Sequence, residues 1–132
     1  MNNFIFQNAT KVYFGKGCVK EYMSCLTKSA NKILLAYGGG SIKRNGIYDE
    51  VIGILKETNK TIIEFSGIMA NPTYAKVQEG AKLAKENNVD MILAIGGGSV
   101  MDCSKAVSLS ARYEGDIWDD FWASATRSQA VK

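Results

Sequence analysis

The sequence predicts an α/β domain built on a parallel sheet whose two faces are both covered by helices. Two uninterrupted apolar runs, at 33–37 and 91–95, and the strand-like segment 61–65 favour this fold, and a stretch with helical spacing precedes each of them. Strands buried on both faces read as continuous apolar runs, whereas half-exposed strands alternate with polar residues. Alternation of helices and strands at this interval indicates right-handed βαβ crossovers in a layered sheet.

The expected elements follow from the period of the apolar residues. Apolar side chains recur at helical spacing in 19–26, 47–55 and 77–84, and strands are expected at 33–37, 61–65 and 91–95. A last helix is expected to start at Ser99. Before these elements, Phe4-Ile5-Phe6 and Val12-Tyr13-Phe14 are aromatic or branched and predict an N-terminal β-hairpin. Residues 1–121 are thus expected to form one domain, and 122–132, which lack periodicity, an irregular tail.

Composition narrows the classes of function. The 132 residues, 46% of them hydrophobic, suffice for one core. The net charge of +3 is scattered along the chain, which argues against a nucleic-acid partner. We find neither a leader pattern nor an apolar run of the roughly 18 residues a membrane span requires, and therefore expect a soluble cytoplasmic protein. The chain has no histidine, so it lacks the usual general base and the commonest transition-metal ligand.

A glycine-rich turn follows the third expected strand. The run Gly96-Gly97-Gly98-Ser99 leads directly into the last helix. Glycines let the backbone approach a ligand closely, and the free N–H groups at a helix start attract a phosphate. Two alternatives to a phosphate site remain open: Ser99 with Asp102 resembles a helix-capping pair, and such turns also occur for steric reasons. The pattern is not the G-x-G-x-x-G dinucleotide fingerprint.

A second glycine run, Gly38-Gly39-Gly40, follows the first strand and leads to Ser41, Lys43 and Arg44. No acidic residue lies between Lys32 and Asp49. An acidic residue after such a strand binds the ribose 2′-hydroxyl of NAD, whereas a basic loop accommodates the 2′-phosphate of NADP. The alternative is a solvated loop with a tight turn.

Asn71-Pro72-Thr73 follows the second strand, and Asn71 or Thr73 is expected to cap the next helix. Because ligands collect at the carboxyl ends of parallel strands, Gly38, Asn71 and Gly96 are expected at one ligand-binding edge. Cys103 falls on the inner stripe of the last helix and is interpreted as a core residue, not a nucleophile. The aromatic residues Trp118, Phe121 and Trp122 indicate packing against a partner or against the domain's own edge.

Together, these motifs resemble the iron-containing alcohol dehydrogenases. The resemblance rests on Gly96-Gly97-Gly98-Ser99-Val100-x-Asp102-x-x-Lys105, on Asn71-Pro72-Thr73, and on the opening Phe-x-Phe-x-x-x-Thr-x-x-x-Phe-Gly-x-Gly. The stretch Tyr37 to Lys43 is most similar to the butanol dehydrogenase branch. The resemblance implies a Rossmann-like N-terminal half that binds NAD(P)(H). It also implies a helical C-terminal half, absent from this sequence, that holds Fe²⁺ or Zn²⁺ through one Asp and three His.

The resemblance also implies roles for individual residues. Gly97, Gly98 and Ser99 would contact the pyrophosphate, with Asp102 beside the cofactor and Asn71 on its adenosine side. Gly38 falls where NAD-preferring relatives often carry Asp, so NADP(H) is the expected cofactor and NAD(H) the alternative, with Ser41 and Lys43 facing the 2′-phosphate. The complete set of expected cofactor-binding residues is Gly38, Gly39, Gly40, Ser41, Lys43, Asn71, Gly97, Gly98, Ser99 and Asp102.

Residues 123–132 do not resemble the family's continuation, and the family's histidine ligands have no counterpart here. We therefore interpret the sequence as a truncated cofactor-binding domain, with no catalytic or metal-binding residue, that binds NADP(H) without interconverting primary alcohols and aldehydes. One alternative is a stand-alone module for another nucleotide or phosphorylated metabolite, with the aromatic C-terminal end contacting a protein partner or a second copy. Another is a fragment that binds nothing well because a missing half orders its loops.

Overall fold

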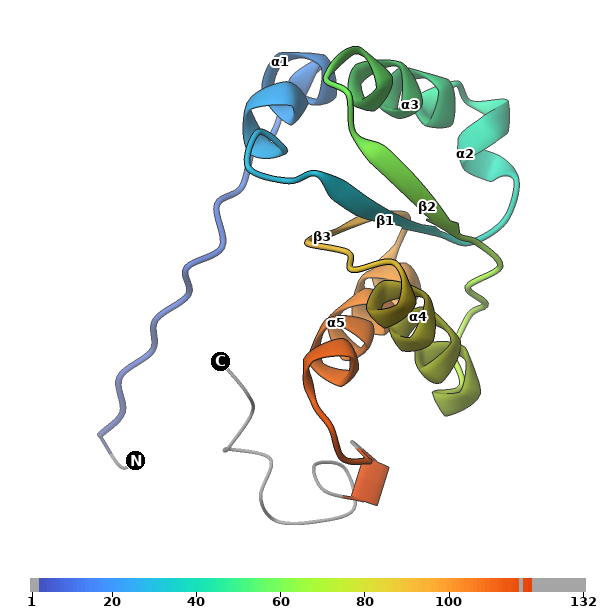
Figure 1. The fold of residues 1–132 in the computed structure, drawn as a ribbon. Helices are drawn as coiled ribbons and strands as arrows, with labels where there is room; N and C mark the ends of the chain where they lie inside the picture. The colour runs from blue at the N-terminus through green and yellow to red at the C-terminus, as the bar shows by residue number, and fades with distance from the viewer. Residues whose placement is uncertain (1–2, 117, 120–132) are drawn as a thin grey trace.

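A computed structural model describes residues 3–116 and 118–119 and places three parallel strands in one sheet. The strands are β1 (Lys32–Tyr37), β2 (Thr61–Phe65) and β3 (Met91–Ile95), in the order β2-β1-β3. One face of the sheet is covered by α1 (Cys18–Leu26), α2 (Ser41–Arg44) and α3 (Ile47–Glu57). The other face is covered by α4 (Tyr74–Glu86) and α5 (Gly98–Arg112) (Figure 1). The predicted α/β fold with a parallel sheet is confirmed.

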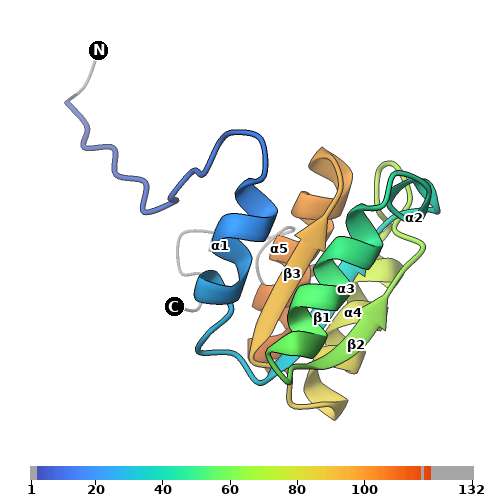
Figure 2. The same cartoon turned by 90° about the horizontal axis from the view of Figure 1, so that it is seen from above.

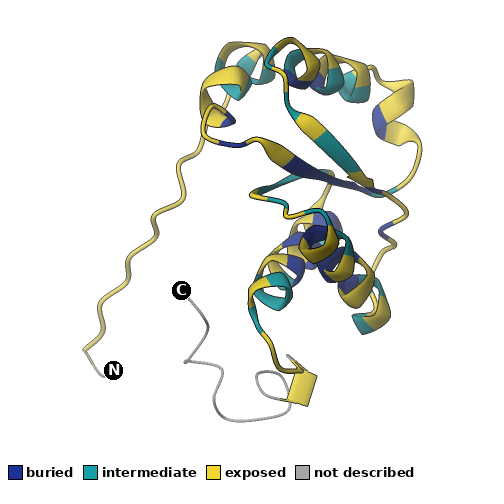
Figure 3. Ribbon diagram, viewed as in Figure 1, coloured by how far each residue is buried: buried dark blue, intermediate teal, exposed yellow. Residues whose placement is uncertain are grey.

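The central position of β1 in the sheet explains why residues 33–37 are all apolar. Residues 33–37 are all buried, and β1 pairs with a strand on each side. Leu34 and Ala36 face the core shared with α4 and α5, while Ile33, Leu35 and Tyr37 face the core under α3. Burying each large apolar side chain stabilises the fold by about 1.5–3 kcal/mol, so the two cores on either side of β1 hold the layers together. Figure 3 shows this burial concentrated between the sheet and its helices.

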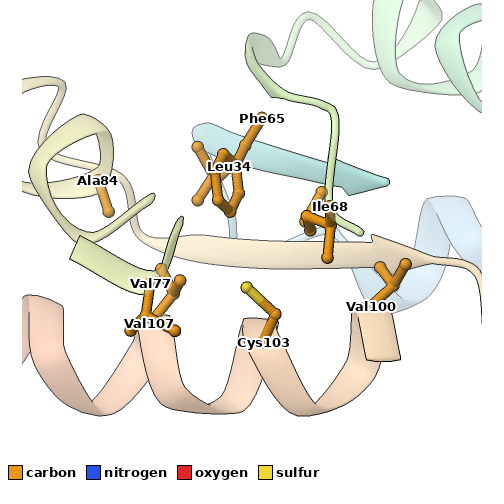
Figure 4. Close-up of a cluster of buried hydrophobic side chains, with 9 residues drawn as sticks. Leu34, Phe65, Ile68, Val77, Ala84, Val100, Cys103 and Val107 are labelled. Carbon is orange, nitrogen blue, oxygen red and sulfur yellow. The ribbon is translucent and has the colours of Figure 1, made fainter. Parts of the chain in front are cut away.

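The helix α4 packs closely against both β2 and α5 at a small residue, Gly80. A Cβ added at Gly80 would lie 2.7 Å from Phe65 Cε1 and 2.7 Å from Val107 Cγ2. Both distances are shorter than real Cβ contacts, so a larger residue at position 80 would force the helices and the sheet apart. Phe65, Val77 and Val107 fill this core from β2, α4 and α5 (Figure 4).

The predicted N-terminal hairpin is wrong. Residues 3–14 form no strand and are exposed, and the exposed fractions of Ile5 and Phe14 are both 98%. The aromatic and branched residues that suggested strands prefer a half-buried pleated surface, and the described residues offer them none. A two-stranded hairpin by itself is marginally stable in water. This segment meets the domain where the Tyr13 and Tyr22 rings pack with centroids 4.7 Å apart.

The region after β1 and the start of the last helix also differ from the prediction. The last helix begins at Gly98, one residue before the expected start, and residues 41–44, interpreted as part of a loop, form the short helix α2. None of the helices in the described ranges is both long and apolar enough to cross a membrane. The predicted tail at 122–132 lies outside the described residues, as do Phe121 and Trp122. Trp118 packs against Tyr74 of α4, with ring centroids 6.0 Å apart, so this aromatic residue contacts the domain itself.

Candidate cofactor-binding site

The carboxyl ends of the three strands lie together at one edge of the domain. The arrows of β2 and β3 point to this edge, where α2 lies (Figure 2), and β1 runs parallel to both. The segment after β2 is tied to β1 by hydrogen bonds from Gly67 N to Gly38 O (2.9 Å) and from Ile68 N to Tyr37 O (3.3 Å). Val100 of α5 lies beside both glycine turns: its Cγ2 is 3.9 Å from a Cβ added at Gly38 and 2.6 Å from one added at Gly96. The turns at 38 and 96 therefore adjoin each other, as the sequence predicted.

The fold requires glycine at only one of the three positions in the 96–98 turn. Gly96 has φ +155°, and an added Cβ would clash with Val100, so the fold itself requires glycine there. Gly97 and Gly98 are exposed, have no left-handed backbone angle, and would place an added Cβ in open space. The described part of the chain therefore gives no steric reason for glycine at 97 or 98.

The N-terminus of α5 has no side-chain cap. Its N-cap is Gly97, whose carbonyl oxygen accepts a hydrogen bond from Met101 N at 3.1 Å. Ser99 is inside the first turn, so the capping alternative for Ser99 and Asp102 is wrong. By contrast, the hydroxyl oxygen of Thr73 caps α4 by accepting a hydrogen bond from Lys76 N at 3.2 Å, as predicted. The first N–H groups of α5 thus receive no side-chain cap, and they lie at the edge where the strands end.

The glycines of the 38–40 turn are also unequal. A Cβ at Gly38 would lie 3.0 Å from Ile68 O, so Gly38 permits the close approach of the segment after β2. Gly39 is exposed, and an added Cβ would meet nothing within 4 Å. Gly40 is the N-cap of α2, and Arg44 Nη1 lies 3.2 Å from the position of its added Cβ. Gly39 therefore resembles Gly97 and Gly98, because packing within the described chain does not explain it.

Lys43 has aromatic neighbours that the sequence pattern did not reveal. Its Nζ lies 4.7 Å from the centroid of the Tyr48 ring and 5.6 Å from that of the Tyr37 ring. The Tyr48 hydroxyl donates a hydrogen bond to Glu64 Oε1. This bond, together with burial, raises the pKa of Tyr48 to about 12. The available signal was an aromatic residue in the first turn of the helix after the basic loop, but Glu64 is distant in sequence.

The other expected site residues occupy less constrained positions. Asn71 is exposed and has φ +49°, a left-handed angle that Asn tolerates, which supports a turn role for its backbone. Ser41 begins α2 and is exposed. Asp102 is exposed and lines a cavity of about 190 Å³. The other residues that line this cavity are Pro72, Tyr74, Val77, Cys103, Ala106 and Trp118, and the sequence assigned none of them to the site.

No metal site is formed by the residues at 3–116 and 118–119. They include no group of three or more His, Cys, Asp or Glu residues that could hold a metal ion, and the whole sequence lacks histidine. Cys103 is buried, and burial is the main reason that the pKa of its thiol is raised. A thiol with a raised pKa is a weak nucleophile at neutral pH, which agrees with the core role expected for this residue.

Comparison with known proteins assigns the family. The sequence profile of the iron-containing alcohol dehydrogenases matches residues 9–132. This chain belongs to that family. The residues at 3–116 and 118–119 do not fit the iron of the family's name, so no catalytic step through a metal can be assigned to them.

Similar proteins include both NADH- and NADPH-dependent enzymes. Probable NADH-dependent butanol dehydrogenase 2 of Bacillus subtilis is 46% identical over 131 residues, which cover 99% of this chain and 34% of the relative. The NADPH-dependent aldehyde reductase YqhD of Escherichia coli is 38% identical over 117 residues, which cover 89% of this chain and 30% of the relative. The crystal structure of NADH-dependent butanol dehydrogenase A from Thermotoga maritima has a TM-score of 0.83 at 46% identity. The match covers 92% of this chain and 31% of the crystallised chain. The chain spans about a third of the length of these relatives.

Proposed function

We propose that this chain binds a nicotinamide dinucleotide at the carboxyl edge of its sheet. Within an iron-containing alcohol dehydrogenase, this part of the protein would hold the cofactor while primary alcohols and aldehydes are interconverted. The observation that carries the proposal is that Gly39, Gly97 and Gly98 are glycines facing open space. A ligand backed against the polypeptide explains why these positions lack side chains, because a Cβ there would occupy the ligand's volume.

The pyrophosphate would lie against the start of α5. The N–H groups of Gly98, Ser99 and Val100 belong to the first helical turn, where the helix dipole attracts an anion. The half-buried Ser99 would add its hydroxyl as a further donor. Asp102 would lie beside the cofactor near the cavity it lines, and Asn71 would contact the adenosine side, at the turn between β2 and α4.

We propose NADP(H) rather than NAD(H) as the preferred cofactor. The loop after β1 has Gly38 where an acidic residue would exclude the 2′-phosphate, and Ser41 and the exposed Lys43 would bind that phosphate. The similar proteins are named for both cofactors: four relatives that are 41–48% identical are named as NADH-dependent, and YqhD, at 38%, as NADPH-dependent. The preference for NADP(H) therefore rests on the chemistry of the 38–44 loop alone.

Calorimetric titration of the 132-residue chain with NADPH and NADH tests this proposal. We expect both to bind, with the lower Kd for NADPH. Tighter binding of NADH would contradict the assignment of Ser41 and Lys43 to the 2′-phosphate. Binding of sugar phosphates in place of either dinucleotide would favour a stand-alone phosphometabolite module, and a lack of all binding would overturn the proposed function.

We further propose that this chain by itself does not transfer hydride to or from an alcohol. It has no histidine to act as a base, and Cys103 is buried in the core. An assay that follows NADPH absorbance with butanal as substrate, with iron or zinc added, should show no turnover. Turnover by the purified chain would contradict this part of the proposal. A cytoplasmic location and association between copies stay expectations.

A further inference from the structure

The ammonium group of Lys43 lies beside two tyrosine rings from different elements. Tyr37 is the last residue of β1, and Tyr48 lies in the first turn of α3. Their rings meet edge to face, with centroids 5.7 Å apart and an interplanar angle of 67°. Lys43 Nζ lies within 6 Å of both ring centroids, which is the range of cation–π attraction. Such a contact at an exposed site contributes about 0.5–1 kcal/mol, so it restricts the flexible side chain of Lys43 before any ligand arrives.

Glu64 in turn fixes Tyr48. The Tyr48 hydroxyl donates its hydrogen bond to Glu64 Oε1, and Glu64 lies opposite Leu35 in the parallel register of β1 and β2. Residues opposite each other in a sheet point to the same face, so Glu64 lies on the α3 side with Tyr48. The Tyr48 hydroxyl, whose pKa this bond helps to raise to about 12, is protonated at neutral pH and can donate the bond. The ring that holds Lys43 is thereby anchored to the sheet.

We propose that Tyr48, anchored by Glu64, is a positioning residue that presents the Lys43 ammonium to the 2′-phosphate of NADPH and so determines the preference for NADPH over NADH. This inference rests on the proposed function. A free lysine side chain loses much rotamer entropy when it binds a phosphate, whereas a lysine already held on an aromatic ring loses less. Neither Tyr48 nor Glu64 needs to touch the cofactor. Their effect should therefore vanish when the 2′-phosphate or Lys43 is missing.

The test compares NADPH and NADH binding by calorimetry in the 132-residue chain. Tyr48→Leu removes the ring that faces Lys43 and should raise the Kd for NADPH about two- to fivefold, the magnitude of a cation–π contact at an exposed site. The Kd for NADH should not change. In a Lys43→Met background, which removes the ammonium, Tyr48→Leu should have no further effect on NADPH. Tyr22→Leu, at a tyrosine of α1 that packs on Tyr13, is the matched control and should leave the ratio of the two Kd values unchanged.

A purely structural role would weaken both dinucleotides equally, so an unchanged ratio in folded Tyr48→Leu would overturn the inference. An equal loss in the Lys43→Met background would also overturn it. If Tyr48→Leu does not fold, Tyr48→Phe keeps the ring and removes only the bond to Glu64. It should raise the Kd for NADPH about twofold and leave that for NADH unchanged; a ratio equal to that of wild type would then overturn the inference. If wild type binds neither dinucleotide, the proposed function fails first, which is a distinct result.

Discussion

The substitution Gly98→Ala separates a glycine that the ligand requires from one that the fold requires. Its added Cβ would meet no atom within 4 Å, and position 98 is the first residue of α5, where alanine is favourable. Folding stability should therefore stay equal or rise, by up to about 1 kcal/mol. Gly96→Ala is the matched contrast, because φ +155° and a 2.6 Å approach to Val100 Cγ2 oppose any side chain. Strain and overpacking together should destabilise it by about 2–4 kcal/mol.

The effect on the cofactor should be the reverse of the effect on stability. A methyl group at 98 would push the pyrophosphate away from the first N–H groups of α5. A hydrogen bond to a charged group contributes about 1.5–3 kcal/mol, so Gly98→Ala should raise the Kd for NADPH roughly 10- to 100-fold.

Thermal unfolding with and without NADPH measures both effects in one experiment. At a ligand concentration about 100 times Kd, wild type should gain about 2.7 kcal/mol, or roughly 10 °C in Tm. A variant whose Kd is 100-fold weaker should gain only about 0.4 kcal/mol, or roughly 2 °C. If NADPH raises the Tm of Gly98→Ala as much as that of wild type, the claim that the ligand requires glycine at 98 is refuted. If Gly96→Ala is as stable as wild type, the claim that backbone strain and Val100 require glycine at 96 is refuted.

Three further predictions concern the scaffold. Thr73→Ala removes the oxygen that caps α4 and should lower the free energy of unfolding by about 0.5–2 kcal/mol in urea titrations, whereas an unchanged midpoint would show that the cap contributes nothing. Gly80→Ala should destabilise the fold by about 1–3 kcal/mol because its Cβ would clash with Phe65 and Val107. The control Gly53→Ala, on the exposed side of α3, should be neutral or stabilising by up to about 1 kcal/mol. Equal effects of the two substitutions on the free energy of unfolding would contradict the close packing at Gly80. The pKa of Tyr48 is raised in the folded state from 10.0 to about 12, so the stability due to its protonated form is complete below pH 10 and is lost as the pH rises toward 12. The advantage of wild type over Tyr48→Phe in urea midpoint should narrow across that interval, and a constant difference would contradict the assigned role of the hydroxyl.

The apolar pattern of the sequence was sufficient to predict the buried strands. The strand at 61–65 and the strand at 91–95 have the predicted bounds, and β1 begins one residue earlier at Lys32. The runs at 33–37 and 91–95 are apolar because helices cover both faces of the sheet, and a continuous apolar run therefore predicts a strand of such a sheet. The N-terminal hairpin failed because residues 4–6 and 12–14 show propensity without a surface to pack on.

The sequence predicted that the candidate site lies at the carboxyl edge of the sheet, but it did not predict the contacts of individual residues there. The rule that ligands meet the carboxyl ends of parallel strands brought the turns at 38 and 96 together, and the structure confirms that they adjoin. Sequence could not separate Gly96 from Gly97 and Gly98, because the difference lies in a backbone angle and in the position of Val100. It also could not pair Tyr48 with Glu64, since their contact requires α3 to lie over β2.

Amide NMR of the 132-residue chain during titration with NADPH measures the central claim most directly. If the first turn of α5 holds the pyrophosphate, the largest chemical-shift changes should fall on the amides of Gly97, Gly98, Ser99 and Val100, accompanied by Gly39 on the neighbouring turn. Saturable changes confined to residues away from both turns, with the amides at 97–100 unmoved, would contradict the claim.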